Sequence, residues 1–168
     1  NIVYKSTNKN PDWIKPYMMT IRNNRKVGVV GVIGKLENSI NQAMLTDYTF
    51  LDPISTAKTY IQKLRVEEKC DSVIVAIHDY DETLNANIAR LSDDERIDLI
   101  LCGHTHTNNY QEFTRNDGKK IIKRIMGIII PCQFFLLYLV KNEALYDCIN
   151  YTLLALFEFG SNNGNITF

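Results

Sequence analysis

Ser72-Val-Ile-Val-Ala-Ile77 is an unbroken apolar run rich in β-branched residues, and His78 follows it directly. Runs of this length and composition are typical of strands that are buried on both faces of a mostly parallel sheet. Similar runs lie before and after it in the chain, at Lys26-Val-Gly-Val-Val-Gly-Val-Ile33 and Ile97-Asp-Leu-Ile-Leu-Cys102. The three runs therefore predict three strands of one buried sheet.

Helices are predicted between these strands. Asp52-Pro53 supplies an N-cap residue beside a first-turn proline, and apolar residues follow at helical spacing from Ile54 to Leu64. Residues 82–91 form the second predicted helix. Because strands and helices alternate, we expect an α/β fold whose parallel strands are joined by right-handed helical crossovers.

The last third of the chain gives two different signals. Asn116-Asp-Gly118 predicts a turn between extended segments at 110–114 and 120–125, which together form a β-hairpin. The apolar stretch 125–140 is shorter than the roughly 20 residues of a membrane-spanning helix. Buried strands are therefore favoured there, and a membrane anchor is the weaker alternative.

Composition narrows the possible function classes. The 168 residues carry 19 basic and 19 acidic side chains, and this balance does not favour nucleic acid as a partner. The four cysteines are far apart and form no Cys-x-x-Cys pair, which argues against a thiolate zinc site. The chain begins Asn-Ile-Val without Met or a signal-peptide pattern, as is typical of a mature or truncated piece.

All three histidines follow predicted strands. His78 ends the second strand, and His104 and His106 follow the third, with Gly103 expected to allow a tight turn between strand and ligands. Since ligands of parallel sheets bind at the carboxyl ends of neighbouring strands, the three imidazoles are expected to converge. Imidazole suits Zn, Mn, Fe, Co and Ni, so the pattern indicates a catalytic metal site. Alternatively, His78 taken alone is an ordinary hydrogen-bonded surface residue.

A family resemblance rests on several segments. Gly103-His104-Thr105-His106-Thr107 looks like the C-terminal metal motif of calcineurin-like metallophosphoesterases. Four other segments resemble parts of 5'-nucleotidases and UDP-sugar hydrolases: Asn1-Ile-Val, Lys15-Pro16-Tyr17, Lys26-Val-Gly-Val-Val-Gly31 and Thr49-Phe-Leu-Asp-Pro53. The resemblance implies that residues 1–125 form the C-terminal half of such a domain and that residues 126–168 are a divergent apolar region of closing strands and tail.

The resemblance also implies a fold and a reaction. We expect part of a four-layer α-β-β-α sandwich with mostly parallel strands and two divalent metal ions, which would be Zn, Mn, Fe, Co or Ni. His78 and His104 would bind one ion and His106 the other. The implied activity is phosphate release from nucleotides or other small phosphoesters by a metal-activated hydroxide. Many 5'-nucleotidases act outside the cytoplasm or at the cell surface, and that location rests on the resemblance alone.

Two departures from the family limit this expectation. The family's other ligands come from Asp-x-His, Gly-Asp and Gly-Asn-His-Glu motifs, and these 168 residues contain none of them. The catalytic residues are therefore expected upstream, the isolated chain is expected to be inactive, and a non-catalytic or degenerate metal-binding homologue is the alternative. Asp79-Tyr80-Asp81 replaces the small or apolar pair that usually follows the strand-end histidine. Either aspartate could orient an imidazole, but a solvated turn is favoured.

Overall fold

The computed structural model describes residues 1–34, 42–79, 81–104 and 109–125. The chain divides into two compact units, residues 1–129 and 130–168, and every described residue belongs to the first unit. The closing strands and tail predicted for residues 126–168 lie outside the described residues. That assignment and the boundary at residue 125 therefore stay predictions.

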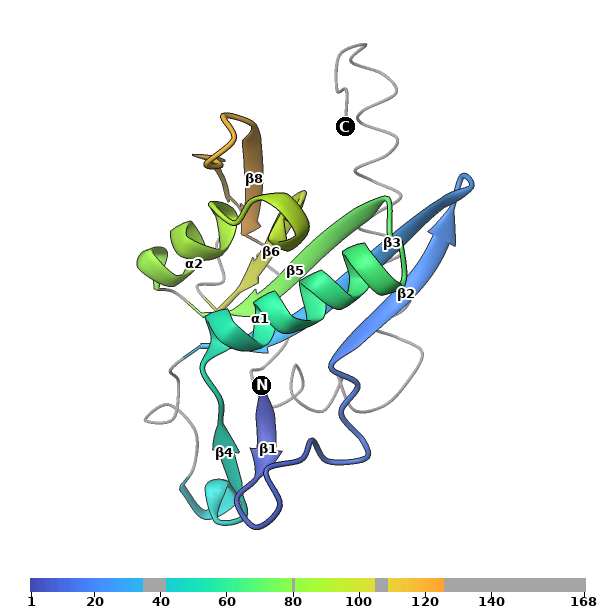
Figure 1. The fold of residues 1–168 in the computed structure, drawn as a ribbon. Coiled ribbons are helices and arrows are strands. Elements are labelled where there is room, and N and C mark those ends of the chain that lie inside the picture. The colour runs from blue at the N-terminus through green and yellow to red at the C-terminus, as the bar shows by residue number, and fades with distance from the viewer. Residues whose placement is uncertain (35–41, 80, 105–108, 126–168) are drawn as a thin grey trace. The chain divides into compact units, whose positions relative to one another are not determined.

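A six-stranded sheet with the order β2-β3-β5-β6-β8-β7 forms the centre of the first unit (Figure 1). Its strands are β2 (Tyr17–Arg22), β3 (Arg25–Ile33), β5 (Ser72–His78), β6 (Leu99–Gly103), β7 (Asn109–Thr114) and β8 (Lys120–Ile125). The neighbouring pairs β3–β5, β5–β6 and β6–β8 are parallel, and the two edge strands pair antiparallel to them. The predicted α/β class with a mostly parallel sheet is confirmed.

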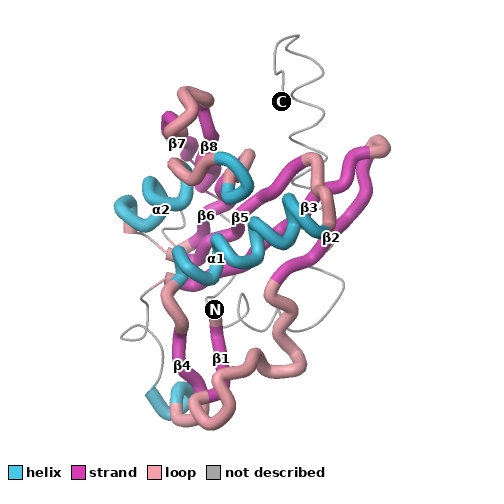
Figure 2. Tube along the Cα trace, viewed as in Figure 1, coloured by secondary structure: helices cyan, strands magenta, loops and turns pink. Residues whose placement is uncertain are grey.

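The two α-helices of the described residues lie on the same face of this sheet (Figures 1 and 2). Helix α1 (Pro53–Gln62) begins at Asp52, whose carboxylate accepts a hydrogen bond from the Ser55 N–H at 2.8 Å, and it continues into a π-helical turn at Lys63–Glu67. Helix α2 (Glu82–Ala89) is shorter than the predicted segment 82–91. No helix in the described ranges is long and apolar enough to cross a bilayer.

One apolar core lies between these helices and the sheet. It contains Ile61 and Leu64 from the first helical segment, Ile88 from α2, and Val75 and Ile100 from the central strands, all with 0% exposure. Burial of this kind stabilises the fold by about 1.5–3 kcal/mol for each large aliphatic side chain. The core therefore fixes the orientation of β5 and β6, the two strands that end at the histidines.

A separate two-stranded sheet pairs β1 (Ile2–Tyr4) with β4 (Tyr48–Phe50), antiparallel. A short 3-10 helix at Gln42–Leu45 precedes β4. The side-chain amide of Asn1 anchors this small sheet. It donates to the carbonyl oxygens of Ile33 and Leu51 at 2.8 Å and accepts from the Ile33 N–H at 2.9 Å. Asn1 thereby joins the end of β3 to the segment that leads into α1.

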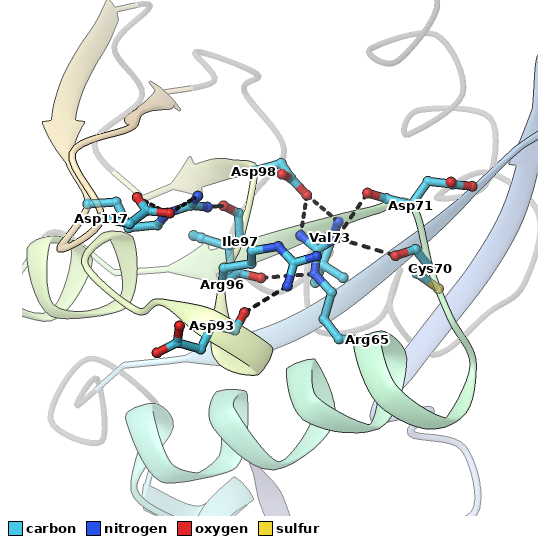
Figure 3. Close-up of polar contacts among 10 residues, drawn as sticks. Arg65, Cys70, Asp71, Val73, Asp93, Arg96, Ile97, Asp98 and Asp117 are labelled. Atoms are coloured by element: carbon cyan, nitrogen blue, oxygen red, sulfur yellow. Dashed lines mark hydrogen bonds and ion pairs between the residues drawn. The ribbon is translucent and has the colours of Figure 1, made fainter. Parts of the chain in front are cut away.

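A buried arginine fixes the opposite end of the parallel strands, before β5 and β6 begin. Arg65 is 8% exposed and donates to the carbonyl oxygens of Arg96 (3.1 Å) and Asp71 (2.9 Å). Its guanidinium also pairs with the Asp98 carboxylate, which accepts from the Val73 N–H at 2.7 Å (Figure 3). Strand β6 begins at Leu99, two residues after the predicted start at Ile97.

Candidate metal centre

His78 is the last residue of β5, at the carboxyl end of the parallel strands. It pairs in register with Ile33 at the end of β3 and with Gly103 at the end of β6. Its side chain is 7% exposed. The buried strand therefore delivers this imidazole to the edge where parallel sheets bind ligands.

His104 lies directly after β6 and faces His78. Its Nδ1 atom is 3.3 Å from Nε2 of His78, and the two rings meet edge to face with centroids 5.1 Å apart. The structure thus brings together two of the three histidines singled out from the sequence. Whether they bind a metal ion is not decided by this contact and stays a prediction.

The distance between these two nitrogens fits a shared metal ion. In a tetrahedral site with metal–nitrogen bonds of about 2.0–2.1 Å, two ligand nitrogens are about 3.3–3.4 Å apart. The observed separation of 3.3 Å agrees with that geometry. It is also short enough for a weak hydrogen bond in which one imidazole N–H donates to the other ring. The donor set therefore fits a metal ion without requiring one.

The backbone of His104 is strained, with a φ of 106°. Residues other than glycine rarely adopt this backbone conformation. It costs about 1–3 kcal/mol and is concentrated at functional sites. The expectation that Gly103 makes the turn is therefore wrong, because Gly103 stays in β6 and His104 takes the positive φ. Gly103 is needed for another reason: a Cβ atom there would lie 3.2 Å from Nδ1 of His78.

His106 lies outside the described residues. Its assignment to a second metal ion stays a prediction. Within the part of the chain that the structure describes, no group of three or more His, Cys, Asp or Glu side chains is placed to hold a metal ion. The described part therefore contributes two imidazole nitrogens to one candidate ion.

The two aspartates after His78 have different surroundings. Asp81 is the N-cap of α2, since its carboxylate accepts from the Thr83 N–H at 2.8 Å and the Leu84 N–H at 3.2 Å. This agrees with the favoured interpretation of a turn residue. Asp79 is only 3% exposed, and its carboxylate accepts from the Asp81 N–H at 3.0 Å. The sequence did not predict that a carboxylate would be buried at this position.

Cys102 supports the end of β5 from the face of the sheet that the helices cover. Its Sγ–H donates to the carbonyl oxygen of Asp79 at 3.1 Å. Burial raises the pKa of the Cys102 thiol, so the group stays a neutral hydrogen-bond donor near pH 7. Sequence reasoning identified Cys102 only as a strand residue, and no spacing signal would have shown its contact with residue 79.

Comparison with known proteins gives one sequence relative and several structural ones. No family model matches the sequence. The chain is 38% identical over 153 residues to an apyrase of Tabanus yao, an alignment that covers 88% of this chain and 25% of that protein. The chain therefore spans about a quarter of the length of this curated relative.

The structural neighbours share the fold at lower sequence identity. A Haemophilus influenzae NAD nucleotidase matches with a TM-score of 0.57 and 20% identity, over 76% of this chain and 27% of that one. A Thermus thermophilus sulfate thiohydrolase matches with a TM-score of 0.60 and 21% identity, over 76% of this chain and 22% of that one. A 5'-nucleotidase precursor from Thermus thermophilus matches with a TM-score of 0.52 and 16% identity, over 66% of this chain and 24% of that one. Together with the apyrase, these likenesses confirm the predicted resemblance, and the structural ones confirm the fold.

Proposed function

The chain resembles 5'-nucleotidase-type calcineurin-like metallophosphoesterases, and from that premise we propose that it belongs to a metal-dependent domain that hydrolyses nucleotide phosphoesters. The observation that carries the proposal is the facing pair of imidazoles, with Nε2 of His78 3.3 Å from Nδ1 of His104 at the carboxyl ends of β5 and β6. The strained φ of His104 supports it, because backbone strain of this kind is concentrated at functional sites.

Each histidine has a defined part in this proposal. His78 and His104 hold one divalent ion through the two facing nitrogens, and His106 contributes to a second ion. When bound, the two ions supply Lewis acidity, which makes hydroxide available near neutral pH and offsets negative charge on the phosphate oxygens. Zn, Mn, Fe, Co and Ni are all compatible with imidazole ligands. The buried position of His78 limits the orientations open to its ring.

The proposed substrate is a nucleotide. Support comes from the names of the relatives, which include an apyrase, an NAD nucleotidase and a 5'-nucleotidase. Another small phosphoester is compatible with the same two-metal chemistry.

We expect the isolated 168-residue chain to bind metal weakly and to be inactive. Asp-x-His, Gly-Asp and Gly-Asn-His-Glu motifs are absent from the sequence, so neither a bridging carboxylate nor a further catalytic histidine from such motifs is available. The alternative is a non-catalytic homologue that binds metal without turnover. The relatives' names do not favour this alternative, since each names a hydrolytic enzyme.

The test compares two proteins, the 168-residue chain and a version joined to an upstream segment that carries the three motifs. Both are loaded with Mn²⁺ or Zn²⁺, and bound metal and phosphate release from AMP are measured, with His104→Ala as the control variant. We expect two ions and turnover in the extended protein, and at most one ion without turnover in the shorter chain. If neither protein binds metal, or if His104→Ala changes nothing, the proposal is wrong.

A further inference from the structure

A buried carboxylate covers the backbone at the end of β3. Gly34 follows β3, and a Cβ atom placed on it would overlap the Asp79 carboxylate and lie 2.7 Å from the Asp79 Cβ atom. Glycine is the one residue that leaves this space open. The two residues are 45 positions apart in the chain, yet the side chain of one occupies the side-chain space of the other.

Asp79 is held in this position by three neighbouring elements. The Gly34 N–H donates to the carbonyl oxygen of His78 at 3.2 Å, which joins β3 to β5 just before Asp79. From β6, the Cys102 thiol donates to the Asp79 carbonyl oxygen at 3.1 Å. From the cap of α2, the Asp81 N–H donates to the Asp79 carboxylate at 3.0 Å. Residue 79 therefore connects three strand ends and the start of a helix.

The position of Asp79 is coupled to that of His78 through the chain. The two residues are adjacent, so any displacement of Asp79 from Gly34 rotates the peptide that carries the imidazole. The ring of His78 lies where a side chain at residue 103 would be, since a Cβ atom on Gly103 would lie 3.2 Å from its Nδ1. A shift of a few tenths of an ångström is enough to change the separation between Nε2 of His78 and Nδ1 of His104.

Simple packing does not explain a carboxylate at this position. Burial of an ionised carboxylate is costly unless hydrogen bonds compensate for the lost water. An apolar side chain would fill space over Gly34 without that cost, but it would not accept from the Asp81 N–H. The carboxylate fills the space and also fixes the loop between β5 and α2.

We propose that Asp79 is a positioning residue that rests on Gly34 and holds His78 in the orientation in which its imidazole faces His104. The inference rests on the proposed function for its consequence, which is metal affinity. Its structural content does not depend on metal, because the orientation of two imidazole rings can be measured in the metal-free chain. Failure of the inference is therefore distinguishable from failure of the proposed function.

The test uses four variants of the 168-residue chain: Gly34→Ala, Asp79→Gly, the double variant Gly34→Ala/Asp79→Gly, and Asp79→Asn. The first readout is the NMR contact between the rings of His78 and His104 without metal. The second is Zn²⁺ affinity, measured by competition with a chromophoric chelator. Asp94→Asn is the matched control, since Asp94 is an exposed carboxylate away from the site. Circular dichroism establishes that each variant is folded.

We expect Gly34→Ala and Asp79→Gly each to lose the ring contact and to weaken Zn²⁺ binding by about 10- to 100-fold, the range seen for groups that orient ligands. The double variant should bind no more weakly than Asp79→Gly, because the carboxylate that the added methyl group would overlap is then gone. Asp79→Asn should keep the ring contact and bind within about twofold of the unsubstituted chain, because the amide has the same shape.

Three outcomes overturn the inference. The first is an intact ring contact in folded Gly34→Ala or Asp79→Gly. The second is a double variant whose loss equals the product of the single losses, which would mean that Gly34 acts independently of Asp79. The third is an Asp79→Asn variant as impaired as Asp79→Gly. If the unsubstituted chain binds no Zn²⁺, the ring contacts alone decide the inference, and the proposed function is decided by metal binding and turnover in the extended protein.

Discussion

Gly103 lies so close to His78 that a Cβ atom on the glycine would be 3.2 Å from Nδ1 of the imidazole. This separation is shorter than ordinary van der Waals contact between these atoms. The two residues pair in register at the ends of β6 and β5. The lack of a side chain at residue 103 therefore leaves the space that the His78 ring occupies.

Gly103→Ala tests this relationship. We expect Zn²⁺ affinity to fall by about 10-fold, because the new methyl group pushes the His78 ring away from His104. Chelator competition measures the affinity, and the thermal unfolding midpoint serves as the control for general damage to the fold. An affinity equal to that of the unsubstituted chain would show that the ring can move without consequence.

The strain at His104 predicts that stability and metal binding oppose each other. His104→Gly relieves a φ of 106° and should make the metal-free chain more stable than His104→Ala by about 1 kcal/mol. Both variants lose the imidazole and should lose metal binding. Urea unfolding in the presence of a chelator measures the difference, and equal stability of the two variants would contradict the strain argument.

Sequence patterns predicted the central elements because their apolar runs are long and regular. The strands at 26–33 and 72–77 were found almost to the residue, and so was the start of α1 at Pro53. Strands β1 and β4 have three residues each, and their positions depend on hydrogen bonds from the Asn1 side chain. A strand of three residues is too short to leave a periodic signal.

The candidate site was predictable in its ligands but not in its supports. Histidines at strand ends can be read from the sequence, whereas the overlap of Asp79 with Gly34 depends on two segments that meet only after folding. Lys123 is a second example. It lies in the hairpin strand β8, where a lysine would be expected to point outward, yet it is 1% exposed and its Nζ pairs with Glu82 of α2 at 2.7 Å.

Asp98→Ala should lower the free energy of unfolding by about 3 kcal/mol, because it leaves the buried Arg65 guanidinium without its carboxylate. Chemical denaturation measures this change. Glu67→Ala is the matched control, since it removes an exposed i,i+4 partner of Lys63 and should cost less than about 0.5 kcal/mol. Similar losses in the two variants would mean that burial of Arg65 adds nothing to the strength of its ion pair.

Acid should weaken the β7–β8 hairpin at a defined pH. The Arg115 guanidinium donates hydrogen bonds to Asp117 and lowers the pKa of that carboxyl from 3.8 to about 2. A carboxylate whose pKa is depressed by folding stabilises the folded state above its unfolded pKa. The contribution is therefore complete above about pH 4 and is lost as the pH falls through the folded value near 2.

NMR titration of the Asp117 carboxyl carbon measures this folded pKa directly. Asp117→Asn should remove the corresponding part of the pH dependence of stability, because the amide does not titrate in this range. Arg115 also donates to the carbonyl oxygen of Ile97, so the hairpin turn is joined through one guanidinium to the segment that enters β6. Loss of the Asp117 contact should for that reason increase amide exchange in both segments. If exchange rises in the turn alone, Arg115 does not transmit the effect to β6.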